Sequence, residues 1–217
     1  MFFSNLKKSR EKMLENHLKG RNIEDEDIIK AFAEVPREKF VPKKYRNYAY
    51  ADRPLPIEEG QTISQPYIVA KMLQVVEPSS NKVALEIGTG SGYAAAVLSR
   101  IVKKVYGIEH YKTLVQKAKK RFNELGYDNI NIKEGNGRKG WEEKAPFDII
   151  IVSAAASDVP SILLEQLEEN GRLIIPVGNK FSQKLILYKK EDGQVVENKL
   201  SLVRFVPLVS EDNKDKE

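Results

Sequence analysis

The chain of 217 residues is long enough to bury a sizeable core, since 41% of its residues are hydrophobic and 31% are charged. It contains no cysteine, which excludes disulfides, thiolate metal ligands and cysteine nucleophiles, and its two histidines argue against a histidine-rich metal centre. The net charge of +5 is mild and spread along the chain, so it permits nucleic-acid binding without indicating it.

Neither a membrane anchor nor a secretion signal is expected. No apolar run approaches the roughly 20 residues that a membrane span needs. Residues 1–8 also lack the apolar core and small-residue cleavage site of a signal peptide. We therefore expect a soluble, cytoplasmic protein that does not bind a membrane. A monomer without a nucleic-acid partner is expected as well.

Residues 1–60 are predicted to form a helical and irregular N-terminal subdomain. Apolar side chains fall on one side of a helix over residues 2–19, and a second helix is expected over residues 25–35, where Pro36 stops it. A stretch interrupted by prolines follows over residues 37–61, and its composition is typical of irregular structure.

From residue 61 onward, predicted strands alternate with predicted helices. Strands are expected over Val83–Ile87, Val105–Glu109, Ile130–Lys133, Phe147–Val152, Arg172–Pro176, Lys184–Lys190 and Leu200–Leu208. Helices are expected between Pro66 and Pro78 and over Tyr93–Ile101, Lys112–Leu125 and Val159–Leu167.

This alternation predicts an α/β fold with a doubly wound, mostly parallel sheet. No helix separates the last two strands, so an antiparallel C-terminal edge is expected. The core then covers residues 61–209, and residues 210–217 form a flexible tail. Such sheets bind ligands beyond the carboxyl ends of their strands. We therefore expect functional residues just after Ile87, Glu109, Lys133 and Val152.

The first strand of this core runs into a loop of small residues, Gly88-Thr89-Gly90-Ser91-Gly92. Backbone amides in such a loop approach a ligand closely. A dinucleotide-binding loop has its third glycine at the position of Tyr93, so Tyr93 disfavours that kind of site. The loop also lacks the Gly-Lys-Ser/Thr sequence of a nucleotide-binding P-loop, which is therefore excluded. Glu109 ends the next strand, where a carboxylate accepts hydrogen bonds from a ribose diol. Together, the glycine loop and Glu109 favour a binding site for an adenosine ligand. The alternative is that the loop is only a tight turn and that Glu109 is a surface residue.

These residues resemble a known family. Residues 86–92 resemble the first motif of class I S-adenosylmethionine-dependent methyltransferases, and residues 60–70 resemble the signature of protein-L-isoaspartate (D-aspartate) O-methyltransferases. The resemblance continues in order to about residue 209 through Gly140-Trp141, Ala145–Asp148, Ser153–Ala156, Leu164–Leu167, Gly171–Gly178 and Arg204–Leu208.

The resemblance implies a Rossmann-like protein-repair enzyme. Such an enzyme transfers a methyl group from S-adenosyl-L-methionine to the free carboxylate of L-isoaspartyl, and also D-aspartyl, residues in damaged proteins. The products are the methyl ester and S-adenosyl-L-homocysteine, and no metal is involved. Because a carboxylate with a pKa near ~3.9 is already ionised at neutral pH, no strong general base is needed.

The matching positions imply the site residues. Ser64 is the catalytic candidate, whose hydroxyl holds the substrate carboxylate, with Thr62 beside it. The alternative for Ser64 is a helix N-cap, and the two roles are compatible. Ala154 and Ala155 are small enough to admit a peptide substrate. Arg204 borders the substrate, although a solvated strand charge is the simpler interpretation.

The same motifs imply cofactor contacts from Glu86, Gly88, Gly90, Gly92, Glu109, Asn136 and Gly137. Asn136 departs from the family, which usually has aspartate there to accept from the adenine amino group. The amide oxygen of asparagine still accepts a hydrogen bond, but without the charge.

Two rival functions remain open. A nucleic-acid methyltransferase would show Asn/Asp-Pro-Pro-aromatic after the fourth strand, where this chain has Ser153-Ala154-Ala155-Ala156. A non-catalytic S-adenosylmethionine-binding adaptor is disfavoured by Ser64 and kept open by Asn136. A metal-dependent small-molecule O-methyltransferase would need a carboxylate cluster around the ligand, and we reject it.

Overall fold

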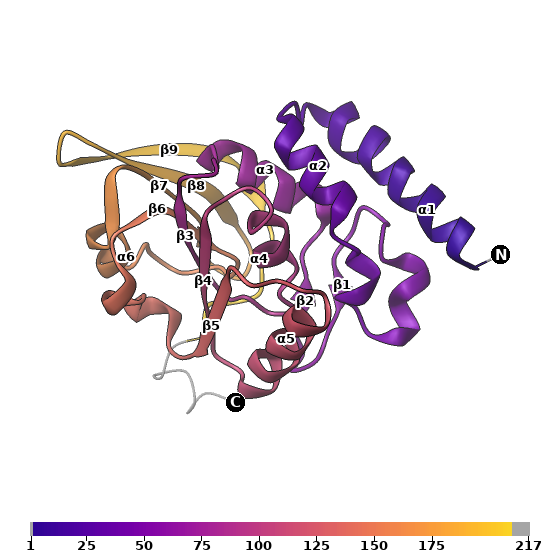
Figure 1. The fold of residues 1–217 in the computed structure, drawn as a ribbon. Coiled ribbons are helices and arrows are strands. Elements are labelled where there is room, and N and C mark those ends of the chain that lie inside the picture. Colours follow the sequence, from indigo (N-terminus) through magenta and orange to yellow (C-terminus); the bar gives the residue numbers. More distant parts are fainter. Residues whose placement is uncertain (1, 210–217) are drawn as a thin grey trace.

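The computed structural model describes residues 2–209, which are built around a seven-stranded sheet (Figure 1). Its strands are β3 (Val83–Ile87), β4 (Lys104–Glu109), β5 (Ile130–Glu134), β6 (Phe147–Val152), β7 (Leu167–Gly178), β8 (Gln183–Glu191) and β9 (Gln194–Val203). The strand order is β5-β4-β3-β6-β7-β8-β9. Strands β3 to β7 pair in parallel with one another, whereas β8 pairs antiparallel with both β7 and β9. The predicted fold class is confirmed, including its antiparallel edge.

Helices cover both faces of the sheet. Successive residues of a strand point to opposite faces, so neighbouring residues pack against different helices. Ala84 belongs to the hydrophobic cluster that contains α3 (Pro66–Val76), α4 (Tyr93–Leu98) and α5 (Lys112–Glu124). Its neighbour Leu85 belongs to the second cluster, which includes Leu163 of α6 (Ser161–Glu165). The nearly continuous apolar run of β6 follows from this covering on both faces.

The N-terminal residues add helices to the face of the sheet that α3, α4 and α5 cover. Helix α1 (Phe2–Lys12) continues as a π-helix over Met13–Leu18, and α2 (Glu26–Glu34) begins after Asp25. The Asp25 side chain caps α2 by accepting from the backbone amide of Ile28 at 3.1 Å. A 3-10 turn over Lys19–Arg21 connects the π-helix to the segment before α2.

The stretch predicted to be irregular contains short regular elements. Two 3-10 turns cover Arg37–Lys39 and Lys43–Tyr48, and β1 (Leu55–Pro56) pairs antiparallel with β2 (Thr62–Ile63). Further 3-10 turns, over Gly137–Lys139 and Glu142–Lys144, follow β5. Residues before and after position 60 share one hydrophobic cluster, so the division into subdomains at residue 60 stays a prediction.

Several expected boundaries were wrong, among them the start of β7, which begins at Leu167 and not at Arg172, and the end of α4, which ends at Leu98 and not at Ile101. The last strand was predicted over residues 200–208, but β9 ends at Val203 and residues 204–208 leave the sheet. The hairpin turn at Asp192-Gly193, both with positive φ, lets β9 pair with β8 immediately after the turn. The helix predicted over residues 159–167 is shorter, because Leu167 already begins β7.

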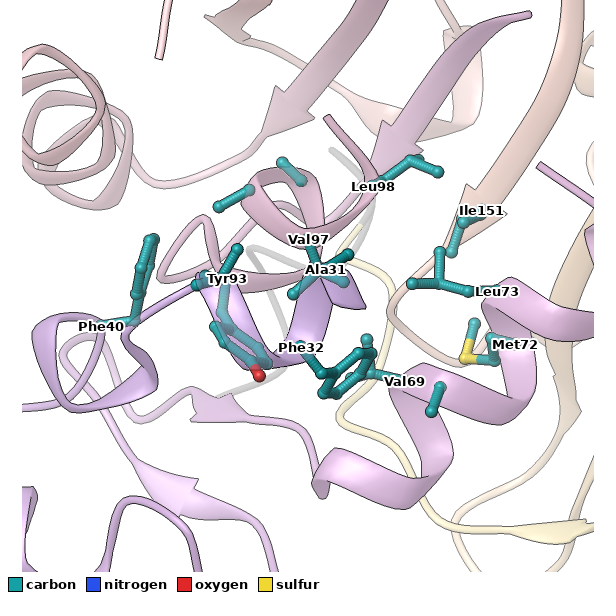
Figure 2. Packing of buried hydrophobic residues seen from close by; sticks show 14 of the residues in the cluster. Ala31, Phe32, Phe40, Val69, Met72, Leu73, Tyr93, Val97, Leu98 and Ile151 are labelled. Atoms are coloured by element: carbon teal, nitrogen blue, oxygen red, sulfur yellow. The ribbon is translucent and has the colours of Figure 1, made fainter. Parts of the chain in front are cut away.

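The predicted flexible tail, residues 210–217, lies outside the described residues. Within residues 2–209, no helix is long and apolar enough to cross a bilayer. Figure 2 shows the larger core, where side chains of α2, α3 and α4 pack together and Leu73 lies beside Ile151 of β6.

Two leucines of this chain test the importance of that packing. Leu73 is 1% exposed and Leu202 is 72% exposed. Leu73→Ala leaves a cavity in the core, so we expect its free energy of unfolding to fall by about 2–5 kcal/mol. The same change at Leu202 should stay within about 0.5 kcal/mol. Urea denaturation of both variants measures the difference, and equal losses would contradict the packing described here.

Candidate active site

The carboxyl ends of β3, β4 and β6 meet at one edge of the sheet, where the chain order reverses. After β3 the chain adds β4 and β5 on one side and then returns to place β6 on the other (Figure 1). Two adjoining hollows at this edge share Thr62, Gly88, Gly90 and Ser153, and together we call them the loop cleft. Open α/β sheets bind their ligands at such a reversal.

The glycine loop forms the floor of the loop cleft. Gly88, Gly90 and Gly92 all have positive φ, at 80°, 54° and 85°. A Cβ on Gly92 would also lie 2.6 Å from the ring of Phe122 in α5, so only glycine fits there. The backbone amide of Gly88 donates to the carbonyl of Ile108 at 2.8 Å, which ties the loop to β4.

Glu109 is held against this loop by two backbone amides. Its Oε2 accepts from the amide of Gly90 at 2.7 Å, and its Oε1 accepts from the amide of Tyr111 at 3.0 Å. The side chain is 6% exposed, so the alternative of a surface glutamate is wrong. Glu109 and His110 both line the loop cleft.

Glu86 is the second buried carboxyl group, and it is poorly satisfied. The Ser153 hydroxyl donates to its Oε1 at 3.0 Å, while its Oε2 has no hydrogen-bond partner within residues 2–209. Burial raises the pKa of Glu86 to about 8, and the nearby charge of Glu109 adds to this, although the Ser153 hydrogen bond opposes it. A cation in the loop cleft would stabilise the ionised form.

Thr62 and Ser64 face the loop cleft from the opposite side, between β2 and α3. The N-cap of α3 is Gln65, whose side chain makes no capping hydrogen bond, so the interpretation of Ser64 as an N-cap is wrong. Ser64 also lines a groove of about 270 Å³, which we call the serine groove. The opposite wall of the serine groove is formed by residues 202–206.

Thr62, Ser64 and Ser153 line both the loop cleft and the serine groove. Three hydroxyl groups from different parts of the chain therefore stand where the two hollows meet. Ser153 was missed as a site residue by the sequence prediction. Its position directly after the β6 strand was the signal that could have found it.

Arg37 fixes the backbone of Ser64, and nothing in the sequence indicated this role. Its Nη2 donates to the Ser64 carbonyl and its Nε to the Ala49 carbonyl, both at 2.7 Å. The guanidinium lies over the ring of Tyr93 at 4.7 Å from the centroid. Arg37 is 0% exposed, and burial lowers its pKa. This buried cation links the N-terminal residues, Ser64 and the start of α4.

Asp52, also from the N-terminal part of the chain, holds the residues that follow Ser64 at the start of α3. Its Oδ2 accepts from the Gln65 side-chain amide at 2.7 Å, and its Oδ1 accepts from the Tyr67 backbone amide at 3.3 Å. The start of α3 is thus anchored by a carboxylate, which the positive end of a helix favours.

Asn136 and Gly137 lie at the turn after β5. The Asn136 Oδ1 accepts from the Arg138 backbone amide at 2.9 Å and so caps the following 3-10 turn. A Cβ on Gly137 would collide with the Ile87 side chain, which explains the glycine. Gly137 lines the loop cleft, whereas Asn136 lines a different hollow, described below.

The two alanines predicted to bind substrate do not lie together in one hollow. Ala154 lines the loop cleft. Ala155 pairs with the C-terminal segment, donating to the Val206 carbonyl at 2.8 Å and accepting from the Leu208 amide at 2.7 Å. The structure therefore brings Glu86, Gly88, Gly90, Glu109, Gly137, Thr62, Ser64 and Ala154 around the loop cleft. The predicted residues Gly92, Asn136 and Ala155 do not line it.

No group of three or more His, Cys, Asp or Glu side chains that could hold a metal ion occurs within the described range, residues 2–209. The polar atoms of the loop cleft are instead backbone amides, hydroxyl groups and two carboxyl groups. Such a set suits an organic ligand that carries a diol and a cationic group.

A family model described as Protein-L-isoaspartate(D-aspartate) O-methyltransferase matches residues 8–213. The chain belongs to this family. The resemblance stated from the sequence is therefore confirmed.

Relatives of the isoaspartate O-methyltransferase family match along nearly the whole chain. The Protein-L-isoaspartate O-methyltransferase of Pelotomaculum thermopropionicum is 53% identical over 94% of this chain and 89% of its own length. The protein of the same name from Petrotoga mobilis is 52% identical over 92% of this chain and 94% of its own length.

A solved structure of this family has the same fold. It is described as a protein-L-isoaspartate O-methyltransferase from Plasmodium falciparum in complex with S-adenosyl-L-homocysteine. Its TM-score is 0.78 at 32% identity, covering 91% of this chain and 96% of that one.

The raised pKa of Glu86 makes the stability of this protein depend on pH. Its folded pKa of about 8 exceeds the ordinary value of 4.5, so the folded state holds the proton more tightly than the unfolded state. The resulting stabilisation is complete below pH 4.5 and is lost as the pH rises through about 8.

For the ligand-free protein, we expect Glu86→Gln to remove this dependence, because the amide cannot ionise. Relative to the wild type, the variant should gain stability between pH 5 and pH 9, at about 1.4 kcal/mol per unit of pKa shift before solvent screening. Urea denaturation across this range measures the gain, with the exposed Glu142→Gln as control. Parallel stability curves for wild type and Glu86→Gln would refute the raised pKa.

Proposed function

We propose that this protein transfers a methyl group from S-adenosylmethionine to the free carboxylate of L-isoaspartyl residues in damaged proteins. The products are the methyl ester and S-adenosylhomocysteine. One observation carries the proposal: Ser64 stands at the junction of the loop cleft with an open groove of about 270 Å³, on the side where a substrate side chain can approach. D-Aspartyl residues, which the family description also names, are the second substrate class in this proposal.

The loop cleft has groups that fit the cofactor. Glu109 retains acceptor lone pairs beyond its two amide contacts and is proposed to receive the ribose diol. The unpartnered Oε2 of Glu86 is suited to the positively charged methionine end. When bound, S-adenosylmethionine supplies a methyl group activated by its sulfonium.

Gly137, Ile108 and Leu208 line the part of the loop cleft nearest β4 and β5, and we assign the adenine to it. Asn136 lies behind this part with its Oδ1 already accepting from the Arg138 amide. Adenine recognition in this chain therefore depends more on packing and backbone groups than on a charged acceptor.

The chain's contribution to the reaction is alignment and exclusion of water. The Ser64 hydroxyl is proposed to donate to one oxygen of the substrate carboxylate, which leaves the other oxygen as the nucleophile. Thr62 and Ser153 offer further donors at the same junction. Since the carboxylate is already ionised, the absence of a strong base near Ser64 among the described residues is no obstacle. Good orientation of the reactants supplies up to about 7–11 kcal/mol of barrier lowering.

Methyl transfer to a matched pair of peptides tests the proposal. One peptide carries L-isoaspartate, and its twin carries ordinary aspartate at the same position. We expect radiolabelled methyl groups to be incorporated into the isoaspartyl peptide alone, as a base-labile ester. Transfer to neither peptide would refute the proposed activity. If isothermal titration then still showed S-adenosylmethionine binding, a non-catalytic adaptor would be the better account.

Two substitutions separate the proposed roles of Ser64 and Glu109. Ser64→Ala removes a hydrogen bond to a charged group, so kcat should fall about 10–100-fold while the Kd for cofactor changes little. Glu109→Gln removes the charge that faces the ribose, so Kd should rise about tenfold or more while kcat at saturating cofactor is largely kept. Turnover and isothermal titration measure both constants, and equal losses in the two variants would contradict these assignments.

A further inference from the structure

A second and larger hollow lies on the other side of the C-terminal segment. Its volume is about 1040 Å³. Its walls come from the turn after β5, the loop after β6, the β7–β8 turn and residues 204–208. We call it the basic cleft, because its charged lining side chains are all cationic: Arg138, Lys139, Lys180 and Arg204.

The cations of the basic cleft are only partly neutralised. Arg138 forms an ion pair with Asp158 at 2.9 Å, which also lowers the pKa of that carboxyl group. For Lys180 and Arg204, no ion pair or hydrogen bond of the side chain occurs within residues 2–209, and both side chains are exposed. No aspartate or glutamate side chain lines the cleft in this part of the chain. The cleft therefore attracts negative charge.

The basic cleft adjoins the serine groove across a single segment of the chain. Arg204 and Phe205 line both hollows, so one segment of the chain forms a wall between them. This wall is fixed: the Phe205 amide donates to the buried Gln183 Oε1 at 2.7 Å, and Ala155 pairs with Val206 and Leu208. A polypeptide seated in the serine groove can therefore follow a rigid wall past Arg204 into the basic cleft.

The β7–β8 turn presents Lys180 at the rim of this path. The Asn179 Oδ1 accepts from the backbone amides of Phe181 and Ser182 at 2.9 and 3.0 Å, which holds the turn in shape. Phe181, the next residue of the turn, is 94% exposed, while Lys180 lines the cleft.

We propose that the basic cleft binds an acidic flank of the substrate polypeptide, a few residues from the isoaspartyl residue in the serine groove. This inference rests on the proposed function and adds a substrate preference to it. The cleft is concave and shares Arg204 and Phe205 with the serine groove, which favours the flank of a peptide held there over a nucleic acid. Recognition of this kind acts mainly on the encounter and on KM.

Isoaspartyl peptides with one shared core and different flanks test the proposal. The flanks carry three glutamates, three glutamines or three lysines, placed on either the amino or the carboxyl side. For one of the two sides, we expect kcat/KM for the glutamate flank to exceed that for glutamine about fivefold at low salt, through a lower KM. The difference should shrink at about 0.5 M NaCl, where charges are screened within about 4 Å.

Lys180→Glu and Lys103→Glu are the matched variants. Lys103 is an exposed lysine just before β4, at the opposite edge of the sheet from both hollows. Lys180→Glu should abolish or reverse the preference for glutamate flanks and leave kcat/KM for the glutamine flank within about twofold. Lys103→Glu should keep the preference. Thermal melting of both variants checks that their folds are intact.

The possible outcomes distinguish the two proposals. Equal turnover of all flanks by the wild type, or a preference that survives Lys180→Glu, would overturn the acidic-flank proposal and leave the methyltransferase function standing. No methylation of any isoaspartyl peptide would overturn the proposed function itself. Inhibition by a single-stranded oligonucleotide that is stronger than that by an acidic peptide without isoaspartate would also overturn the flank proposal, in favour of nucleic acid.

Discussion

The buried guanidinium of Arg37 is the constraint on which the arrangement of the site depends. It joins the 3-10 turn that carries it, the carbonyls of Ala49 and Ser64, and the ring of Tyr93 at the start of α4. A buried cation needs acceptors for its donors. The Nε and Nη2 atoms of Arg37 donate to main-chain carbonyls of residues that are distant in sequence, whereas its Nη1 has no hydrogen-bond partner within residues 2–209. The N-terminal region thereby sets the distance between Ser64 and the glycine loop.

The two glutamates of the loop cleft differ in their hydrogen-bond partners, although both are buried. Glu109 receives two backbone amides, whereas Glu86 receives one hydroxyl group and has an oxygen without a partner. Burial then raises the pKa of Glu86 to about 8. The raised pKa favours the uncharged form of Glu86, which lessens the repulsion between the two carboxyl groups of the cleft. A cationic ligand would favour ionisation of Glu86, so a group that costs the ligand-free protein stability at neutral pH is suited to recognise such a ligand.

The segment after β9 divides the ligand-facing edge into separate hollows. Residues 204–208 leave the sheet and run beside Ala155, with the serine groove on one side and the basic cleft on the other. A substrate that contacts both sides of this segment is recognised over several residues. This gives the enzyme a way to distinguish damaged sites by their surroundings, although the reacting carboxylate is the same in each.

Local sequence pattern was sufficient for the order and type of the core elements and for much of the loop cleft. The carboxyl ends of parallel strands meet at one edge of the sheet, so a glycine loop after the first strand lies close to a glutamate that ends the next strand. This rule was enough to predict Glu86, Gly88, Gly90, Gly92 and Glu109 as site residues. The family motif added Thr62 and Ser64. The pairing of β9 directly after a tight turn, by contrast, was not visible in a hydrophobic alternation that continues past Val203. The hold of Arg37 on Ser64, the use of Asn136 as a cap, and the placement of Arg204 in a basic cleft were decided only by the tertiary structure. Each of these depends on contacts between residues far apart in the chain, and hydrophobic periodicity carries no information about such contacts.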